Sequence, residues 1–367
     1  MIYDVAIVGA GMAGASLAAA IGARAGVVLL EGEATPGYHA TGRSAAFWSE
    51  TYGGPGIQPL TTASGPMLRD YLTPLGSLHI GRAQDAGKAD AFLRDFAGTG
   101  VALHRVDPAA FVPGLREAWT VGVMEPSCAY IDVAALHAAE IARARHAGAQ
   151  IVTDAAMQAA SRSGDVWTIE TDAGPVRSRI LVDAAGAWAD IVAARAGVRP
   201  LGLQAYRRTM AQLRTDPGAP AAMPHVVDLS DNFYFKPEPG GRLWLTPHDE
   251  VASDPCDAAP EDIDVAIAID RLEGVVDWHV AAVERRWAGL RTFAPDRLPI
   301  YGFDPAVPGF FWCAGQGGFG IQTAPAGAMI AAALLLGAVP DAAVAGIDVE
   351  RYSPTRFCPR SHKLPSS

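Results

Sequence analysis

The stretch YDVAIVGAGMAGASLAAAIGARAGVVLLE (residues 3–31) decides the fold. Residues 3–9 are an apolar run that predicts a buried parallel strand, residues 12–25 are alanine-rich and predict a helix, and residues 26–31 predict the next strand. A strand, a glycine turn, a helix and a second strand in this order form a βαβ unit. The start of the chain therefore indicates an α/β domain with a parallel sheet.

The glycines of the turn indicate what the unit binds. Gly9, Gly11 and Gly14 follow the spacing GxGxxG, and Glu31 ends the next strand. The first glycine allows a tight turn, the second lets the backbone approach a pyrophosphate, and the third lets helix and strand pack closely. An acid about 20 residues further on accepts hydrogen bonds from ribose hydroxyls, and the positive end of the helix stabilises the pyrophosphate. The motif predicts dinucleotide binding and leaves NAD(P) and FAD both open.

Composition narrows the class of protein. The chain has 367 residues, more than the roughly 250–300 at which one core stops growing, so we expect two domains. Half of the residues are apolar, and a net charge of −10 without a basic run argues against nucleic acid. No apolar stretch reaches the about 20 residues of a membrane span. The four cysteines are far apart, which predicts a reduced, cytoplasmic protein without a metal site.

The pattern of apolar and turn-forming residues changes along the chain. Alternating apolar residues and a Pro-Glu-Pro-Gly-Gly hairpin signal (233–247) are typical of a β-rich domain. We expect a discontinuous dinucleotide domain interrupted by a β-rich substrate domain. The dinucleotide domain is expected at 1–75, 132–204 and 286–367, and the substrate domain at 76–131 and 205–285.

Three segments favour FAD. PGYHATGRSAAFWSETYGG (36–54) holds a small-residue turn suited to crossing a flavin ring, and LVDAAGAWAD (181–190) leads to a turn near the adenine. AGQGGFGIQTAPAGA (314–328) would place N–H groups at a helix start, where they stabilise the anionic edge of a reduced flavin. The expected cofactor contacts are Gly9, Gly11, Met12, Ala13, Gly14, Glu31, Gly32, Arg43, Ser44, Ala45, Ala46, Met157, Ala185, Gly186, Trp188, Gly317, Gly318, Phe319, Gly320, Ile321 and Gln322.

At this point a family resemblance covers nearly the whole chain. The sequence resembles the FAD-dependent D-amino-acid oxidase and dehydrogenase superfamily, which includes glycine oxidase and sarcosine oxidase, and most of all its D-arginine dehydrogenase type. The matching stretches, in the same order, are EATPGYHATGRSAA, AAGAWAD, VRPLGLQAYRR, FYFKP, WAGLRTF and GFFWCAGQGGFGIQT. The resemblance implies an α/β Rossmann-type FAD domain with an inserted antiparallel β-rich substrate domain.

The resemblance also implies a reaction. An amino acid is oxidised by hydride transfer from Cα to flavin N5, and the imine hydrolyses to a 2-oxo acid and ammonia. Sarcosine oxidases attach their flavin to a cysteine, whereas the corresponding segment here reads LRTFAP, so we expect non-covalent FAD. Cys313 is expected to be a buried, apolar strand residue.

The resemblance assigns the substrate's carboxylate to Arg291 in WAGLRTF. A guanidinium suits this role because it pairs with a carboxylate in bidentate fashion. Arg208 in AYRRTM matches a second pocket arginine, and Tyr234 and Tyr52 match tyrosines that bind the carboxylate or close the site. The competing interpretations are a surface ion pair or strand packing for the arginines and core packing for the tyrosines.

The expected pocket departs from that of the arginine-oxidising relatives. Phe47, followed by Trp48, stands where they carry a histidine, and Ser77 stands where we align their acid. Both changes remove charge, so a cationic side chain would lose its ion pair at a cost of several kcal/mol. A neutral or aromatic D-amino acid, or a secondary amine acid, fits better. Gly318 completes the expected pocket, and His79 either faces it or has a structural role.

Other functions remain open at this point. One is FAD-dependent oxidation of another amine or of a 2-hydroxy acid, which would need a base for which the sequence offers no candidate. Another is the flavin subunit of a hetero-oligomeric amino-acid dehydrogenase. We expect a monomer or homodimer that passes electrons to a quinone, another carrier or O2.

Overall fold

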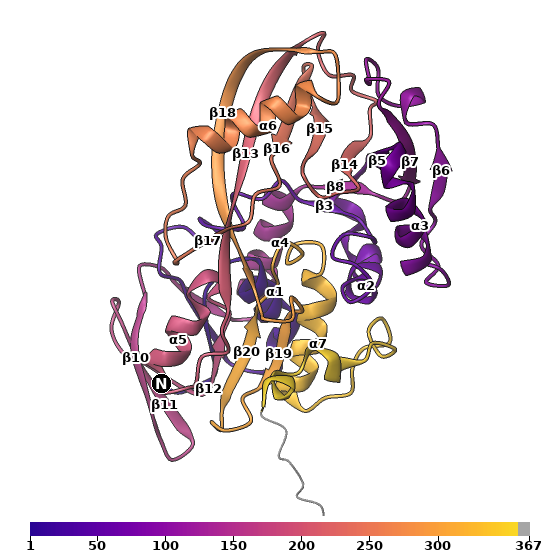
Figure 1. The fold of residues 1–367 in the computed structure, drawn as a ribbon. Helices are drawn as coiled ribbons and strands as arrows, with labels where there is room; N and C mark the ends of the chain where they lie inside the picture. Colours follow the sequence, from indigo (N-terminus) through magenta and orange to yellow (C-terminus); the bar gives the residue numbers. More distant parts are fainter. Residues whose placement is uncertain (359–367) are drawn as a thin grey trace, which may run out of the picture.

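The computed structural model describes residues 1–358 and contains two large sheets, one above the other (Figure 1), and a third, small one. The lower sheet contains the strands of the N-terminal βαβ unit, and the part of the chain that forms the upper sheet consists mostly of strands. This arrangement confirms the predicted α/β fold class. Two long strands, β13 (Gln204–Asp216) and β18 (His279–Phe293), pair with each other and run from the upper sheet toward the lower one.

The lower sheet has the order β10-β11-β12-β1-β2-β9, with β20 beside β12 and β19 beside β20. Strands β9, β2, β1, β12 and β20 are parallel, whereas β10, β11 and β19 pair in antiparallel fashion. The strands are β1 (Tyr3–Val8), β2 (Val27–Leu30), β9 (Gln150–Val152), β10 (Met157–Ser163), β11 (Val166–Thr171), β12 (Val176–Asp183), β19 (Ile300–Phe303) and β20 (Phe310–Ala314).

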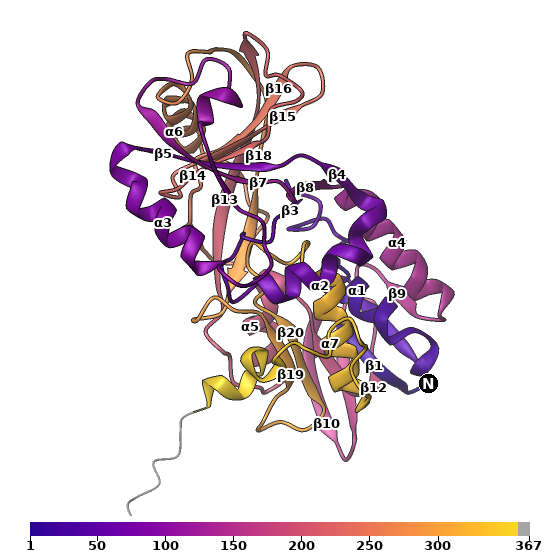
Figure 2. The same cartoon turned by 90° about the vertical axis from the view of Figure 1, so that its right-hand side faces the viewer.

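Both faces of the lower sheet are covered because successive strand residues point to opposite sides. Val5 and Ile7 of β1 pack in one cluster with helices α1 (Met12–Ile21), α4 (Val133–His146) and α7 (Ala324–Leu336), which lie on one side of the sheet in Figure 2. Ala6 and Val8 pack on the other side with α5 (Ala189–Arg195) and Trp167. Cys313 is buried in β20, as expected.

The upper sheet has the order β17-β13-β16-β15-β14-β5-β7-β6, with β18 beside β13. Its pairs are antiparallel except β5 with β14, which is parallel. The turn between β15 and β16 agrees with the predicted hairpin. The sequence places a domain boundary at residue 286, but strand β18 runs through this position and pairs with β13 on both sides of it. Local composition does not reveal such a long-range pairing, so the sequence gives no sign that the strand continues. The other strands are β5 (Ser77–Arg82), β6 (His104–Val106), β7 (Trp119–Glu125), β14 (His225–Asp228), β15 (Tyr234–Glu238), β16 (Arg242–Thr246) and β17 (Val251–Ser253).

Further elements complete the fold. Helix α6 (Asp262–Glu273) packs on β13, β16 and β18, and α3 (Ala86–Asp95) packs on β5 and β7. A small sheet joins β3 (Phe47–Trp48), β8 (Ala129–Ile131) and β4 (Leu72–Pro74) near α2 (Gln58–Leu68). Short 3₁₀ helices lie at Gly22–Arg24, Arg69–Tyr71, Ala83–Asp85, Pro108–Ala110, Gly186–Trp188, Val349–Tyr352 and Pro354–Phe357.

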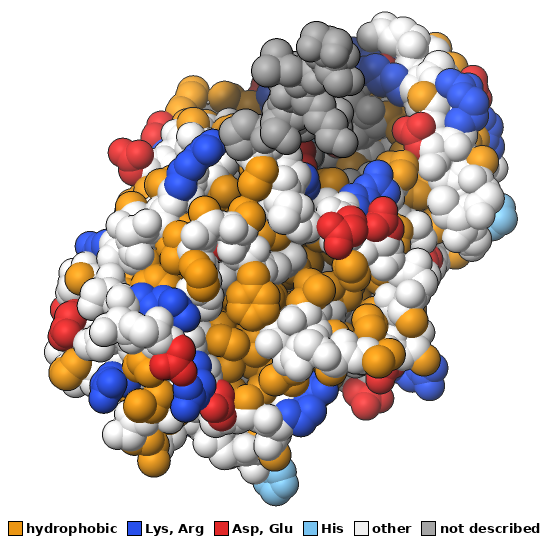
Figure 3. All heavy atoms as spheres, turned by 90° about the horizontal axis from the view of Figure 1, so that it is seen from below, with side chains coloured by type: hydrophobic (Ala, Val, Ile, Leu, Met, Phe, Trp, Pro, Cys, Tyr) orange, Lys and Arg blue, Asp and Glu red, His pale blue; other side chains and the backbone are white. Residues whose placement is uncertain are grey.

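The outer surface is mixed in character. Seen from below, acidic and basic side chains are scattered around apolar areas (Figure 3). Across residues 1–358, none of the helices combines the length and apolar character needed to cross a bilayer.

The glycine turn brings α1 directly against β1. Gly9 has φ +100°, and its N–H donates to the Leu30 carbonyl at 2.8 Å. A Cβ on Gly9 would lie 2.5 Å from the Ala184 carbonyl oxygen, and a Cβ on Gly14 would lie 1.9 Å from the Gly9 carbonyl oxygen. These distances are too short for a side chain, so the two glycines allow the close packing that the sequence predicts.

We expect Gly14→Ala to lower the free energy of unfolding by about 1–3 kcal/mol, because the added methyl group forces α1 away from β1. The matched control is Gly87→Ala, whose methyl group would contact nothing on the exposed surface of α3. That change should be neutral or stabilising by up to about 1 kcal/mol. Urea denaturation of both variants tests the prediction, and equal stability of the two would contradict it.

Candidate functional site

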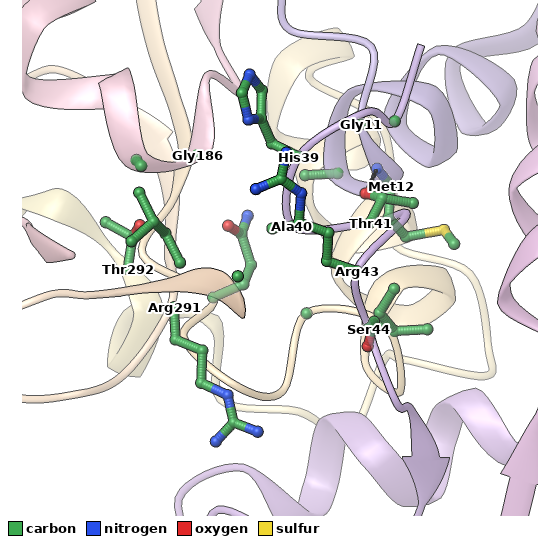
Figure 4. Close-up of a pocket in the computed structure, with 18 of the residues that line it drawn as sticks. Gly11, Met12, His39, Ala40, Thr41, Arg43, Ser44, Gly186, Arg291 and Thr292 are labelled. Atoms are coloured by element: carbon green, nitrogen blue, oxygen red, sulfur yellow. Dashed lines mark hydrogen bonds between the residues drawn. The ribbon is translucent and has the colours of Figure 1, made fainter. Parts of the chain in front are cut away.

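An elongated cavity runs from the glycine turn to strands β13 and β18 (Figure 4). It lies where the carboxyl ends of β1, β12 and β20 meet the edge of the upper sheet. Most of the residues that the sequence assigns to the cofactor line this cavity. They are Gly9, Gly11, Met12, Ala13, Glu31, Arg43, Ser44, Ala45, Ala185, Gly186, Trp188, Gly317, Gly318, Gly320 and Ile321.

One end of the cavity is shaped by Glu31. Its carboxylate accepts hydrogen bonds from the Ala10 N–H at 2.8 Å and from the Glu33 N–H at 3.1 Å. The acid at the end of β2 is thus tied to the glycine turn at the end of β1. The Met12 N–H at the start of α1 donates to Thr41 Oγ1 at 2.9 Å, which joins the turn to the segment that follows β2.

Five lining residues in that segment are not assigned from the sequence: Gly37, Tyr38, His39, Ala40 and Thr41. They belong to the stretch 36–54, of which the sequence assigns only the RSAA turn to the cofactor, since turn residues carry no periodic signal. The ring of His39 packs against the ring of Trp188, with ring centroids 4.6 Å apart. Its Nε2 is 2.7 Å from a Glu33 carboxylate oxygen, while its buried Nδ1 has no partner. An unpartnered polar atom here, together with the glycine cradle, fits a cavity that holds a dinucleotide.

Arg43 fixes the turn between the two sheets. Its guanidinium donates to the Ala258 carbonyl at 2.9 Å and pairs with the Asp257 carboxylate in the loop after β17. Its carbonyl accepts a hydrogen bond from Trp287 Nε1 on β18 at 2.9 Å. The turn is therefore anchored to the upper sheet from both its side chain and its backbone.

Several predicted cofactor contacts lie outside the cavity lining. Gly14 faces the Gly9 carbonyl inside the βαβ unit, and Gly32 faces Ala156. The Ala46 carbonyl accepts a hydrogen bond from the Ile131 N–H, and Met157 is buried in the core of the lower sheet. The side that each of these residues presents depends on packing, which the local sequence does not encode.

Gln322 and Phe319 also take other positions than the sequence predicts. The buried Gln322 amide donates to the Tyr52 carbonyl and to Thr61 Oγ1, both at 3.0 Å, and accepts from the Ser49 N–H at 3.2 Å. All of its polar atoms are thus used within the protein. Phe319 packs against the ring of Tyr52, with ring centroids 5.0 Å apart.

At the other end of the cavity stands Arg291 on β18. Its Nη1 donates to the Tyr52 hydroxyl at 2.8 Å and its Nη2 donates to the Tyr234 hydroxyl at 3.4 Å. Within residues 1–358 it forms no ion pair, because the Glu250 carboxylate pairs with Arg208 and Arg297 instead. A Cβ on Gly318 would lie 2.6 Å from the Tyr52 hydroxyl, so this glycine leaves room beside the pair.

Arg208 lies near Arg291, since Arg208 pairs with Gly289 in the β13–β18 ladder and residues two apart share a face. It is 4% exposed, its Nε donates to the Asp249 carbonyl at 2.7 Å, and its Nη1 has no partner. Burial and the positive charge of Arg291 lower the pKa of Arg208 to about 10. It therefore stays charged at neutral pH, and two cationic groups meet at this end of the cavity.

A second cavity of about 540 Å³ adjoins Arg291, and we call it the side chamber. Phe47, Ser77 and His79 line it, together with Tyr52 and Tyr234.

Trp48 does not line the side chamber, contrary to the sequence prediction. Because neighbouring strand residues point to opposite sides, Trp48 turns away from Phe47. It packs against Gly65 and donates from Nε1 to the Thr61 carbonyl at 2.8 Å.

Comparisons with known proteins agree with this architecture. Residues 4–334 match the family model described as FAD dependent oxidoreductase (DAO). This chain is a FAD-dependent oxidoreductase of the DAO family. FAD is therefore its cofactor, which bears out the prediction from the three glycine-rich segments.

Three relatives illustrate the likeness. The chain is 29% identical over 251 residues to the bifunctional protein ThiO/ThiG of Synechocystis, covering 67% of this chain and 36% of that one. It is 29% identical over 198 residues to glycine oxidase of Pseudomonas aeruginosa, covering 53% and 50%. The chain thus spans half or less of the length of these curated relatives. L-proline dehydrogenase from P. horikoshii has the same fold, with a TM-score of 0.85, 18% identity and coverage of 97% and 98%.

Glu125 is a residue of this oxidoreductase that sequence reasoning missed. It ends β7, is fully buried, and accepts hydrogen bonds from Thr51 Oγ1 (2.6 Å), the Glu50 N–H (2.7 Å) and Ser49 Oγ (2.8 Å). It therefore holds the segment that carries Tyr52 to Arg291. A lone acid at the end of an apolar strand gives no sequence signal for such a role, because its donors come from a distant segment.

The carboxylate form of Glu125 is favoured in the fold. Burial raises its pKa, but the nearby His79 imidazole and the hydroxyls of Thr51 and Ser49 outweigh burial, so the pKa lies below its ordinary value of 4.5. A lowered folded-state pKa contributes stability above pH 4.5 that is lost as the pH falls through the folded value.

We therefore expect Glu125→Gln to lower the free energy of unfolding at pH 7 by about 2–3 kcal/mol, because an amide cannot accept all of these hydrogen bonds. The difference from wild type should shrink as the pH falls below 4.5. Urea denaturation at both pH values measures it, with Glu117→Gln on the exposed surface as the matched control. A pH-independent difference would contradict the assignment.

Proposed function

We propose that this oxidoreductase oxidises the Cα–N bond of an amino acid, with a preference for a D-amino acid whose side chain is neutral or aromatic. The observation that carries the proposal is the Arg291 guanidinium, which is held by two tyrosine hydroxyls and forms no ion pair within residues 1–358. A desolvated guanidinium of this kind favours a bound carboxylate. The names of the relatives, glycine oxidase and L-proline dehydrogenase, support an amine or amino acid as the substrate class.

The residues along the first cavity suit FAD. Glu31 would accept hydrogen bonds from the ribose, and the turn at Gly9 and Gly11 would take the pyrophosphate at the start of α1. The loop 315–321 would lie along the flavin ring. The Gly317 N–H already donates to the Thr292 carbonyl at 2.8 Å, so the N–H groups that follow it are the candidates for the ring's polar edge.

The bound flavin supplies an acceptor for the hydride that leaves Cα. The protein's own residues orient the substrate for that transfer: Arg291 would pair with the carboxylate in bidentate fashion, and the Tyr52 and Tyr234 hydroxyls would add hydrogen bonds. The nearby charge of Arg208 strengthens the anion site. Loss of a hydride from Cα and a proton from nitrogen gives an imine, which water converts to a 2-oxo acid and ammonia.

The side chamber supports a substrate with a sizeable side chain. Ser77 stands where the arginine-oxidising relatives place an acid, and Phe47 and Tyr234 contribute aromatic rings. The D configuration rests on the resemblance of the motifs alone, so both enantiomers belong in every test. The holoenzyme is mixed anaerobically with each member of a panel of D- and L-amino acids and 2-hydroxy acids, and flavin bleaching is followed. We expect an amino acid to bleach the flavin faster than any of the hydroxy acids.

Arg291→Met should keep the fold and the bound FAD but reduce kcat/KM for the fastest amino acid of that panel by roughly 100-fold or more, the scale of a lost charged hydrogen-bond pair. The matched control is Arg285→Met on the same strand, where the side chain is exposed. Visible absorbance reports FAD content, and steady-state kinetics report the loss. Normal turnover by the Arg291 variant, or bleaching by hydroxy acids alone, would refute the proposed function.

A further inference from the structure

Buried polar atoms without a hydrogen-bond partner occur at both cavities. Seven such side-chain nitrogen or oxygen atoms lie within residues 1–358, among them Arg208 Nη1, His225 Nε2 and His79 Nε2, and the last of these lies 3.9 Å from a Glu125 carboxylate oxygen. Arg208 lines the first cavity beside Arg291, and the two histidines line the chamber. Burying a polar atom without a partner costs free energy, so such a cluster points to a ligand that supplies the partners.

One face of two paired strands builds a wall of the chamber. In the parallel pairing of β5 with β14, Ser77 lies opposite His225 and His79 lies opposite Val227. Alternate residues of a strand share a face. All four of these residues line the chamber, so both histidines belong to the same wall.

His225 is the deepest polar group of this wall. It is fully buried, and its Nδ1 lies 3.2 Å from Ser77 Oγ. Burial lowers the pKa of His225 well below its ordinary value, and the neighbouring His79, Lys236 and His248 act in the same direction. The ring is therefore neutral at pH 7. With Nδ1 paired to a hydroxyl, Nε2 offers one hydrogen bond to a further partner, as donor or as acceptor according to the tautomer.

Aromatic rings connect His225 to the carboxylate site. The Phe47 ring lies 4.2 Å from the His225 ring and 5.1 Å from the Tyr52 ring, and the Tyr234 ring lies 5.1 Å from the His225 ring. The hydroxyls of both tyrosines bind Arg291. A ligand whose carboxylate sits on Arg291 can thus extend a flat side chain along Phe47 toward His225.

We propose that His225 determines substrate specificity by hydrogen-bonding a neutral polar group at the far end of an aromatic side chain, such as the phenol of tyrosine. This inference rests on the proposed function, since it takes Arg291 as the carboxylate anchor. A hydroxyl suits both tautomers of the ring because it can donate and accept. A cationic group would gain no ion pair from the His225 ring itself, which is neutral.

The test compares two ligand pairs that differ by one hydroxyl. In the first measurement, the holoenzyme is mixed anaerobically with tyrosine or phenylalanine of each configuration, and the rate of flavin bleaching is recorded. In the second measurement, 4-hydroxyphenylacetate or phenylacetate is titrated into the holoenzyme, and its binding is followed by the change in the flavin spectrum. We expect the hydroxylated member to be favoured roughly tenfold in both measurements, the scale of one hydrogen bond to a buried partner. In His225→Leu the preference should vanish, while phenylacetate still binds.

Control variants separate this role from a structural one. His104→Leu, on the exposed strand β6, should keep the tenfold preference. His225→Gln retains a hydrogen-bonding group and should keep part of the preference, and it replaces the leucine variant if that variant does not fold.

Three results would overturn the inference: no preference in the wild type, an unchanged preference in His225→Leu, or faster bleaching by arginine or lysine than by tyrosine. Failure of the proposed function looks different. In that case no amino acid bleaches the flavin. The arylacetate titration still decides whether His225 forms a hydrogen bond with the phenol hydroxyl.

Discussion

The pairing of β13 with β18 is the constraint on which the candidate site depends. These two strands are paired from Gln204 to Asp216 and place residues of the upper sheet above the cavity of the lower one. Arg208 of β13 and Arg291 of β18 lie on this ladder, and Trp287 of β18 anchors the turn at Arg43. The proposed substrate anchor Arg291 and the lining of the first cavity are thus placed relative to each other by the same pair of strands.

A second feature is the set of buried hydrogen bonds that hold the segment 49–52 in place. Glu125 and Gln322 bind the segment 49–52 from two sides, and that segment presents the Tyr52 hydroxyl to Arg291. Buried polar groups of this kind are stable only when their partners are in place. Of the seven buried polar atoms without partners within residues 1–358, four belong to residues that line the two cavities, namely His39, Arg208, His79 and His225.

Much of the site was accessible from local sequence. The glycine spacing, the acid at the end of β2 and the glycine-rich segment before α7 all line the cavity, because turn geometry and strand ends follow from short-range patterns. Predictions failed where side-chain direction or long-range pairing decides the outcome. Trp48 and Phe47 are neighbours in sequence yet face opposite sides, and Gln322 bonds to the segment 49–52.

The sequence by itself determined the βαβ unit, because this depends on residue types at fixed short spacings, and it indicated the family and FAD through motifs that resemble those of a known family. Only the tertiary structure decided what surrounds Arg291. His225 reaches the side chamber because β14 pairs in parallel with β5, a contact between residues 148 positions apart. Glu125 supports Tyr52 for a similar reason. Such partners are set by strand pairing and burial in three dimensions, and no local pattern in the chain encodes them.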